Sequence, residues 1–292
     1  MRQLVITSGK GGTGKTTVAA CFVALSWRSV CADADVDAPN LHLLLHPKVL
    51  EEREFRGAKT AVKNEELCAR CGKCEEHCRF QAIRGLALDP FRCEGCGVCV
   101  HVCPSGAMRL EEVVTGRTMI SRTRYGPFAH ALLNIGAEAS GKLVTEVRRR
   151  AEGLGQSESL VIIDGAPGIG CPVIASVTGT DLALIVAEPS VSGLHDLARV
   201  LGVARHFQVE ALACINKHDL CPELSEEIAA FCSRENVELA GKIPFDPGLV
   251  EAVRRSAPVE ALLETRAGRA IEEIWEVVKA RLLPPKSFCR GG

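Results

Sequence analysis

A glycine-rich loop close to the N-terminus constrains this chain more than any other feature. Residues 4–7 form a short apolar run, residues 9–16 read G-K-G-G-T-G-K-T, and a helix-like stretch follows over residues 15–26. This is the spacing G-x4-G-K-[ST] in the context that it requires, with a strand before the loop and a helix after it. A chance glycine loop does not explain both the spacing and the context. The sequence therefore predicts a site for the phosphates of a nucleotide.

The residues of this loop are expected to bind the nucleotide in two ways. Glycines leave backbone N–H groups open to phosphate oxygens, and the start of the following helix adds a partial positive charge. Two side chains complete the site, because the Lys15 ammonium should reach the β- and γ-phosphates and the Thr16 hydroxyl should bind Mg²⁺. The other residues that we expect to contact the nucleotide here are Gly11, Gly12, Thr13, Gly14 and Thr17.

Apolar segments farther along the chain predict an α/β fold around this loop. Residues 160–163, 182–186 and 211–215 are continuously apolar rather than alternating, as in strands buried on both faces of a parallel sheet. Helical stretches near residues 193–206 and 223–235 supply the crossovers between them. We therefore expect a doubly wound, mostly parallel sheet of the P-loop class.

Charge and hydropathy argue against several classes of partner. The net charge of −1 gives no reason to expect a nucleic acid or an anionic membrane. No apolar stretch approaches the roughly 20 residues that a spanning helix needs. Residues 269–283 form an amphipathic pattern whose polar face mixes both signs of charge, which favours a closing core helix over a membrane-binding tail. The N-terminus is unlike a signal peptide, so we expect a cytoplasmic protein without membrane insertion.

Cysteines are concentrated in one segment that interrupts the strand–helix pattern. Residues 61–112 are dense in cysteine and glycine and contain the spacing C-x2-C-x2-C-x3-C twice. We therefore predict a small inserted α+β domain over residues 61–112, within a nucleotide domain made of residues 1–60 and 113–292. In a reducing compartment, cysteines at this spacing indicate metal ligands rather than disulfides.

The repeated spacing is typical of bacterial ferredoxins with two 4Fe–4S clusters, in which the fourth cysteine of each run binds the other cluster. Cys103 is followed by the usual proline, whereas Cys78 is followed by Arg79, a departure that removes no ligand. The alternative is a pair of zinc sites with four thiolates each. On the ferredoxin pattern, cluster I takes Cys68, Cys71, Cys74 and Cys103, and cluster II takes Cys93, Cys96, Cys99 and Cys78.

A second lysine in the phosphate loop carries a resemblance to a known family. With Lys10 the loop contains K-G-G-x-G-K-T, which resembles the deviant Walker A motif of the MinD, Mrp and ParA ATPases and of the nitrogenase iron protein. The whole chain resembles members of that superfamily that contain an inserted ferredoxin domain. The resemblance implies ATP hydrolysis by a homodimer that sandwiches the nucleotides, with Lys10 reaching the phosphates of the partner. A lysine placed there would stabilise charge on the transferred phosphoryl group.

Two further motifs match that family in order. Residues 33–40 look like its switch I, and Asp35 is expected to orient the attacking water and to lie at the Mg²⁺ site. Residues 164–168 look like its Walker B and switch II segment. The resemblance implies that Asp164 binds Mg²⁺ through water and that the Gly168 N–H senses the γ-phosphate.

The segment that reads the base leaves two interpretations open. Residues 216–219 match N-K-x-D, the motif with which GTPases read guanine through the aspartate. In the MinD-like family the asparagine and a later proline loop resemble an adenine site, which here implies Asn216, Pro244 and Asp246. We favour ATP over GTP on that resemblance.

Seven cysteines lie outside the two runs. Most fall on apolar faces and are expected to be small buried residues. Cys171 lies seven residues after Asp164, an offset at which the nitrogenase iron protein has a ligand of a cluster shared between subunits, but we favour a packed cysteine. The seven are Cys21, Cys31, Cys171, Cys214, Cys221, Cys232 and Cys289.

The motifs together favour a dimeric ATPase that couples its nucleotide cycle to electron transfer through two 4Fe–4S clusters. Two alternatives stay open. One is an ATPase that carries or assembles clusters, and the other is a positioning or regulatory switch whose clusters sense redox state. The sequence names no redox partner or client protein.

Overall fold

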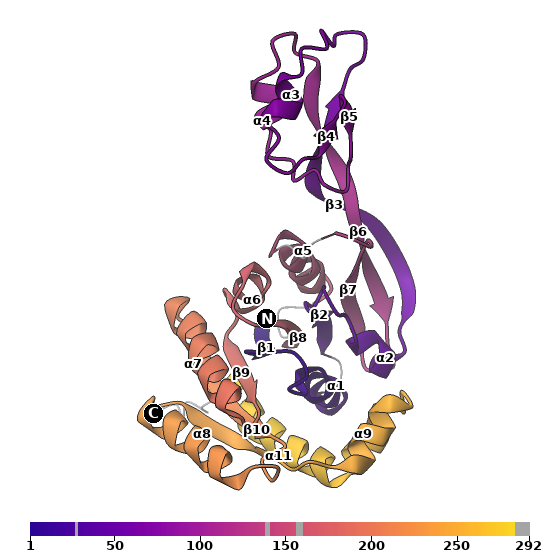
Figure 1. Ribbon diagram of the computed structural model, residues 1–292. Coiled ribbons are helices and arrows are strands. Elements are labelled where there is room, and N and C mark those ends of the chain that lie inside the picture. The colour runs from indigo at the N-terminus through magenta and orange to yellow at the C-terminus, as the bar shows by residue number, and fades with distance from the viewer. Residues whose placement is uncertain (27–28, 138–140, 156–159, 284–292) are drawn as a thin grey trace, which may run out of the picture. The chain divides into compact units, whose positions relative to one another are not determined.

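The strand that precedes the glycine loop lies inside a large sheet (Figure 1). In the computed structural model, β1 (Arg2–Ser8) pairs in parallel with β8 (Leu160–Pro167) and with β9 (Leu182–Ala187). The other strands of the sheet are β2 (Val30–Asp33), β3 (Lys48–Lys63), β6 (Met108–Arg122), β7 (Pro127–Leu133), β10 (Glu210–Asn216) and β11 (Glu238–Ile243). The strand order is β11-β10-β9-β1-β8-β2-β7-β6-β3. The strands from β11 to β7 pair in parallel, which confirms the predicted α/β sheet.

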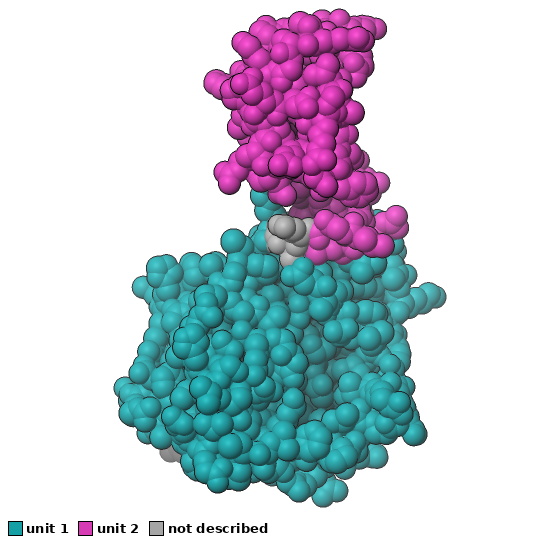
Figure 2. Space-filling view, viewed as in Figure 1, with its two compact units in different colours: residues 1–52, 118–132, 139–292 teal, residues 53–117, 133–138 magenta. Residues whose placement is uncertain are grey.

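The structure describes residues 1–26, 29–137, 141–155 and 160–283. The chain divides into two units, which Figure 2 shows in teal and magenta. Unit 1 comprises residues 1–52, 118–132 and 139–292, and unit 2 comprises residues 53–117 and 133–138. Unit 2 is therefore wider than the segment 61–112 that the cysteines suggested, because the long strands β3 and β6 contribute residues on both sides of that segment.

Helices cover both faces of the sheet of unit 1, because neighbouring side chains of its buried strands point to opposite sides. Leu184 of β9 packs in one apolar cluster with Phe22 and Trp275, whereas Ile185 packs in another with Leu197 and Ile228. The helices of this unit are α1 (Lys15–Ser26), α2 (Leu41–Leu45), α5 (Gly141–Glu152), α6 (Cys171–Val177), α7 (Val191–His206), α8 (Pro222–Arg234), α9 (Pro247–Arg254), α10 (Val259–Leu263) and α11 (Arg266–Leu282).

The C-terminal amphipathic stretch closes the first of these clusters. In α11, Ile271, Ile274, Trp275 and Val278 are buried, and the Trp275 ring lies 4.9 Å from the ring of Phe22 in α1. This confirms the prediction of a core helix. No helix among the described residues is both long and apolar enough to cross a membrane.

Unit 2 repeats its backbone geometry as it repeats its sequence. Its elements are α3 (Lys73–Glu76), α4 (Val98–His101) and the hairpin strands β4 (Ile83–Arg84) and β5 (Ala87–Leu88). Gly72 and Gly97 precede α3 and α4 with φ angles of 74° and 80°. This left-handed conformation favours glycine, so the residue after the second cysteine of each run is set by the turn. The unit packs around Ala61, Cys74, Ile83 and Met108.

A buried histidine within the sheet predicts a pH dependence of stability. His130 of β7 is 7% exposed, and its Nε2 lies 2.8 Å from the Ser121 hydroxyl. Burial, followed by the nearby His42 and Arg150, lowers the pKa of His130 to about 4. Between the usual pKa of roughly 6.5 and about 4, the unfolded chain binds a proton that the folded chain does not. His130 should therefore remove up to roughly 3 kcal/mol of stability as the pH falls through that window.

The measurement is the free energy of unfolding of the wild type and of His130→Gln between pH 4 and 7.5, taken as a difference. Asp164 affects stability in the opposite direction over the same pH window, since its pKa is raised to about 6. Because wild type and variant both contain Asp164, its contribution cancels in the difference between them. The free energy of unfolding of the wild type should fall relative to that of His130→Gln as the pH falls. His195→Gln, at an exposed position, is the control. A difference that does not change with pH would contradict the prediction.

Candidate functional site

The phosphate loop connects β1 to α1 and is held from the side by the end of β10. Gly12 and Gly14 have φ angles of 79° and 95°, where a side chain would strain the backbone. The Asn216 side-chain amide donates to the Thr13 carbonyl at 2.7 Å. A Cβ atom at Gly14 would lie 2.3 Å from Nδ2 of Asn216. The loop glycines therefore serve both the turn and this close approach.

A cavity of about 510 Å³ lies beside the loop. One wall is polar, and another is apolar with Leu44 of α2, Pro172 of α6 and Val253 of α9. The structure brings together at this cavity most of the residues predicted for the phosphates and Mg²⁺. The residues of its polar side are Gly11, Gly12, Gly14, Lys15, Thr16, Thr17, Asp35, Asp37 and Asn40.

Lys15 is buried in this site against carboxylates. Its Nζ lies 2.5 Å from Oδ2 of Asp35, and both side chains are 7% exposed. Burial alone would lower the pKa of Lys15, but the charges of Asp164 and Asp35 outweigh it and raise that pKa above its usual value. Lys15 is therefore a fixed positive charge at the start of α1, where phosphates would lie. Asp35 is its partner in this structure.

Asp164 has the features of a cation ligand. It lies within β8, in register with Asp33 at the end of β2, and neither of its fully buried carboxylate oxygens has a hydrogen-bond partner. Burial raises the pKa of Asp164 to about 6, although Lys15 and the nearby Thr16 hydroxyl lower it in part. A buried carboxylate beside a hydroxyl is the oxygen donor set that Mg²⁺ prefers. The residues present therefore fit Mg²⁺, with Asp164 and Thr16 as its holders.

Asp33 was given no role by the sequence, yet it shapes the segment that carries Asp35. It is 1% exposed and accepts the backbone N–H groups of Asp35 at 3.1 Å and of Leu41 at 3.2 Å. Burial and the charges of Asp164 and Asp35 raise its pKa well above the usual range. It joins the end of β2 to the start of α2. The D-x-D spacing was the available signal, because the first carboxylate can accept the N–H two residues later.

Gly168 does not offer its N–H to the cavity in this structure. Its N–H donates to the Ser8 carbonyl at 2.9 Å, and its φ of 95° requires a glycine. To sense a γ-phosphate it would have to leave Ser8.

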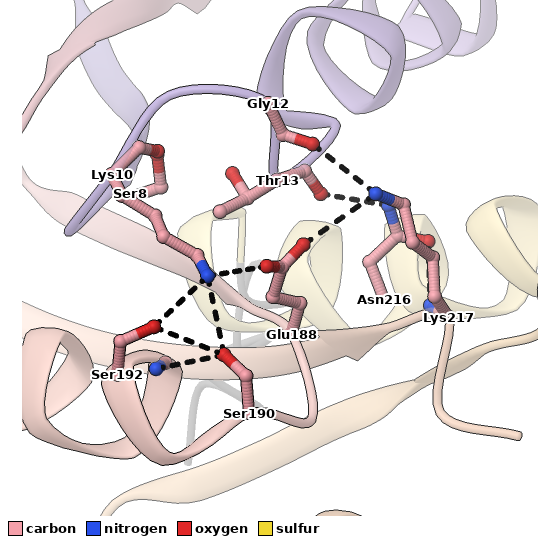
Figure 3. A network of polar contacts seen from close by, with 10 residues as sticks. Ser8, Lys10, Gly12, Thr13, Glu188, Ser190, Ser192, Asn216 and Lys217 are labelled. Carbon is pink, nitrogen blue, oxygen red and sulfur yellow. Dashed lines mark hydrogen bonds and ion pairs between the residues drawn. The ribbon is translucent and has the colours of Figure 1, made fainter. Parts of the chain in front are cut away.

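Lys10 is not among the described residues that line the cavity. Its side chain lies beside Glu188, Ser190 and Ser192, at the junction of β9 and α7 (Figure 3). Its Nζ forms an ion pair with Glu188 and donates to the hydroxyls of Ser190 and Ser192, each at 3.1 Å. Lys217, at the end of β10, lies 3.4 Å from the same carboxylate. Partial burial alone would raise the pKa of Glu188, but Lys10 and then Lys217 outweigh it and hold that pKa below its usual value.

The residues predicted to read the base make contacts within the chain, and their role toward a base stays a prediction. Asp219 accepts the Phe245 N–H at 2.6 Å and pairs with Arg266 at 3.1 Å. Asp246 caps α9, accepting the N–H of Gly248 at 2.8 Å. Pro244 is buried. Among the described residues that line the large cavity, Asn216, Pro244 and Asp246 do not occur.

The eight clustered cysteines line two cavities of unit 2. One cavity is lined by Cys78, Cys93, Cys96 and Cys99. The other is lined by Cys68, Cys71, Cys74 and Cys103. The structure thus exchanges the fourth cysteine of each run, as the ferredoxin pattern predicts.

Backbone N–H groups point at several of these sulfurs. Ala82 donates to Cys78 Sγ at 3.3 Å, and Ala107 donates to Cys103 Sγ at 3.2 Å, at equivalent places of the repeat. Such contacts favour the thiolate form that binds iron. Among the described residues, no three His, Cys, Asp or Glu side chains surround a single point closely enough to hold one ion. Four thiolates with N–H donors are nevertheless the donor set of a 4Fe–4S cluster, so the residues fit that group.

The other cysteines mostly behave as predicted. Cys21, Cys31, Cys214 and Cys232 are buried, and Cys221 is partly buried. The prediction of a packed cysteine at Cys171 is wrong, because it is exposed at the start of the short helix α6. Cys289 lies outside the described residues.

Comparison with known proteins shows the family and the fold. Residues 4–259 match the CobQ/CobB/MinD/ParA nucleotide binding domain. The septum site-determining protein MinD of Pyrococcus horikoshii, solved with Mg-ADP, aligns with a TM-score of 0.59 at 21% identity over 95% of both chains.

Several curated proteins are similar in sequence, and three of them are described here. An uncharacterised protein of Methanocaldococcus jannaschii is 34% identical over 218 residues, 74% of this chain and 78% of that protein. The iron-sulfur cluster carrier protein of Pyrococcus abyssi is 26% identical over 298 residues, 96% of this chain and 86% of that protein. The polyferredoxin protein MvhB of Methanothermobacter thermautotrophicus is 41% identical over 56 residues, 18% of this chain and 14% of that protein.

Proposed function

Because the chain belongs to the CobQ/CobB/MinD/ParA family of P-loop ATPases, we propose that its nucleotide cycle is coupled to electron transfer through two 4Fe–4S clusters. The observation that carries this proposal is the grouping of the eight cysteines into two cavities with exchanged fourth members. The match to a polyferredoxin supports it. When bound, each cluster accepts and releases one electron.

On this proposal the residues of the large cavity bind Mg-ATP. Lys15 holds the β- and γ-phosphates, and Asp164 and Thr16 hold the cation. The Asp35 carboxylate leaves Lys15 and orients the attacking water instead. The Gly168 N–H moves from Ser8 to the γ-phosphate. These last two exchanges give the switch segments two states, which a coupled ATPase requires.

The working unit that we propose is a homodimer in which Lys10 meets the nucleotide of the second copy. The motif of Lys10 and the family support it. The base is proposed to be adenine, because both carboxylate oxygens of Asp219, which guanine would need, are held by Phe245 and Arg266.

Delivery of clusters is the second candidate, favoured by the resemblance to iron-sulfur cluster carrier proteins. A carrier must release its cluster. Here each cavity takes cysteines from both runs, so the release of either cluster requires cysteines of both runs to give up their iron. That interlocking favours electron transfer.

The test is the midpoint potential of each cluster in anaerobic protein with Mg-ATP and with Mg-ADP. Coupling predicts a difference of tens of millivolts, where about 59 mV is a tenfold change for a one-electron couple. Identical potentials together with unchanged electron transfer would reject the proposal. ATP-dependent transfer of iron and sulfide to an apo-ferredoxin would favour the carrier, and hydrolysis that follows cluster oxidation state without an electron acceptor would favour a regulatory switch.

A further inference from the structure

The phosphate loop contains two lysines that the structure uses in different ways. Lys15 lines the cavity and pairs with Asp35. Lys10 instead forms an ion pair with Glu188, just after β9 (Figure 3). The side chains of Lys10 and Glu188 are 31% and 22% exposed. One of the two positive charges of the loop is therefore neutralised by a carboxylate of the same chain.

Glu188 receives a second ammonium group that also contacts the loop. Lys217 lies 3.4 Å from Oε2 of Glu188 and donates to the Gly12 carbonyl at 3.3 Å. The Glu188 carboxylate, held by two ammonium groups at the edge of a phosphate loop, resembles in its contacts an anionic phosphate oxygen in such a site.

The backbone fixes the place of this carboxylate. Ser190 caps α7 by accepting the Gly193 N–H at 3.0 Å, and a Cβ atom at Gly193 would lie 2.2 Å from the Glu188 carbonyl. A Cβ atom at Gly9 would lie 2.2 Å from Cβ of Asp196 in α7. The start of α7 is thus packed directly against the start of the loop, so Lys10 meets acceptors whose position is set by the fold.

We propose that Glu188 is a positioning residue that competes with the phosphates of a bound nucleotide for Lys10. The Lys10 ammonium that pairs with Glu188 is unavailable to a phosphate, and a nucleotide must draw it away before the loop presents its full positive charge. Glu188 therefore weakens nucleotide binding and keeps Lys10 paired until a nucleotide binds. This inference rests on the ATPase activity of the family and is independent of the proposed electron transfer.

The test is the affinity of the intact protein for Mg-AMPPNP after Glu188→Gln, which keeps the shape and removes the charge. We expect binding to tighten about threefold to tenfold, the range for partly exposed ion pairs. Glu227→Gln, an equal change of charge on the exposed face of α8, should leave the affinity unchanged. Unchanged or weaker binding by Glu188→Gln would overturn the proposal.

A double variant separates competition from a general structural effect. In a Lys10→Met background, Glu188→Gln should lose most of its gain, because the residue acts through Lys10. A full gain in that background would overturn the assignment. If Glu188→Gln does not fold, Glu188→Asp, which shortens the reach of the carboxylate, should give a smaller gain in the same direction, and its absence would equally overturn the proposal.

Protein concentration distinguishes the source of the phosphates. If Lys10 meets the nucleotide of its own chain, the gain should persist in dilute monomer. If it meets the nucleotide of a second copy, the gain should appear as tighter nucleotide-dependent dimerisation in sedimentation measurements. If Glu188→Gln changes neither nucleotide affinity in dilute monomer nor nucleotide-dependent dimerisation, the proposed competition for Lys10 is rejected.

Discussion

Lys15→Met should abolish ATP hydrolysis, with a decrease of at least about a thousandfold, as for other charges that meet the transferred phosphoryl group. The ammonium is buried at the start of α1 and lies 2.5 Å from Asp35. Without it, the loop loses the charge that attracts phosphates. Asp35 and Asp164 also lose the neighbouring positive charge that Lys15 supplies. The rate of phosphate release at saturating Mg-ATP measures the loss of hydrolysis.

The same variant should lose stability in a pH-dependent manner. Breaking a buried ion pair costs about 3–5 kcal/mol. The loss should be largest at neutral pH and smaller in acid, where Asp164, whose pKa is raised to about 6, becomes protonated. Lys242→Met, which removes a partly exposed lysine paired with the exposed Glu226, is the matched control and should change neither ATP hydrolysis nor the pH dependence of stability. Hydrolysis within tenfold of the wild type would contradict the role of Lys15.

Cys78→Ser and Cys103→Ser should each remove a cluster, and not the cluster that sequence proximity suggests. Cys78 shares its cavity with Cys93, Cys96 and Cys99, and Cys103 shares the other with the earlier run. Iron and sulfide should each fall from about eight to about four per chain in either variant, since each cluster holds four of each. The EPR signal that remains in Cys78→Ser should match that of Cys96→Ser.

Cys221→Ser, outside both cavities, should retain full iron and sulfide. A spectrum of Cys78→Ser that matches Cys71→Ser would show that the fourth cysteines are not exchanged. Zinc in place of iron, without visible absorbance, would reject the cluster interpretation and leave the alternative of two zinc sites.

The sequence predicted the phosphate loop and the α/β sheet because both depend on short-range patterns. The glycines at positions 12 and 14 are required by the local φ angles, and continuous apolar runs are required of strands buried on both faces. The two cysteine quartets were also predictable from short-range patterns, because the repeated cysteine spacing is accompanied by repeated turns at Gly72 and Gly97. The boundaries of unit 2 were harder to predict from the sequence, since β3 and β6 continue beyond the cysteines.

The sequence was less informative about side chains whose partners lie far along the chain. Asp246 is predicted to lie at the base, and the sequence did not show that it also caps α9 and accepts the Ala267 N–H at 3.2 Å. Asp33 was given no role, although it accepts two N–H groups of its own segment and lies in register with the distant Asp164 of β8. The D-x-D spacing indicates only the contact of Asp33 with the Asp35 N–H, and no local pattern predicts the contact of Asp246 with the Ala267 N–H.

The sequence by itself thus determined the loop, the strands, the helices that follow them and the grouping of the cysteines, since each follows from spacing within a short segment. Only the tertiary structure decided that Asp33 and Asp164 lie side by side, that His130 is buried, and that Lys10 meets Glu188. Those contacts depend on the strand order, which places β1 between β8 and β9. Side chains more than a hundred residues apart meet only because crossover connections bring their strand ends to one edge of the sheet.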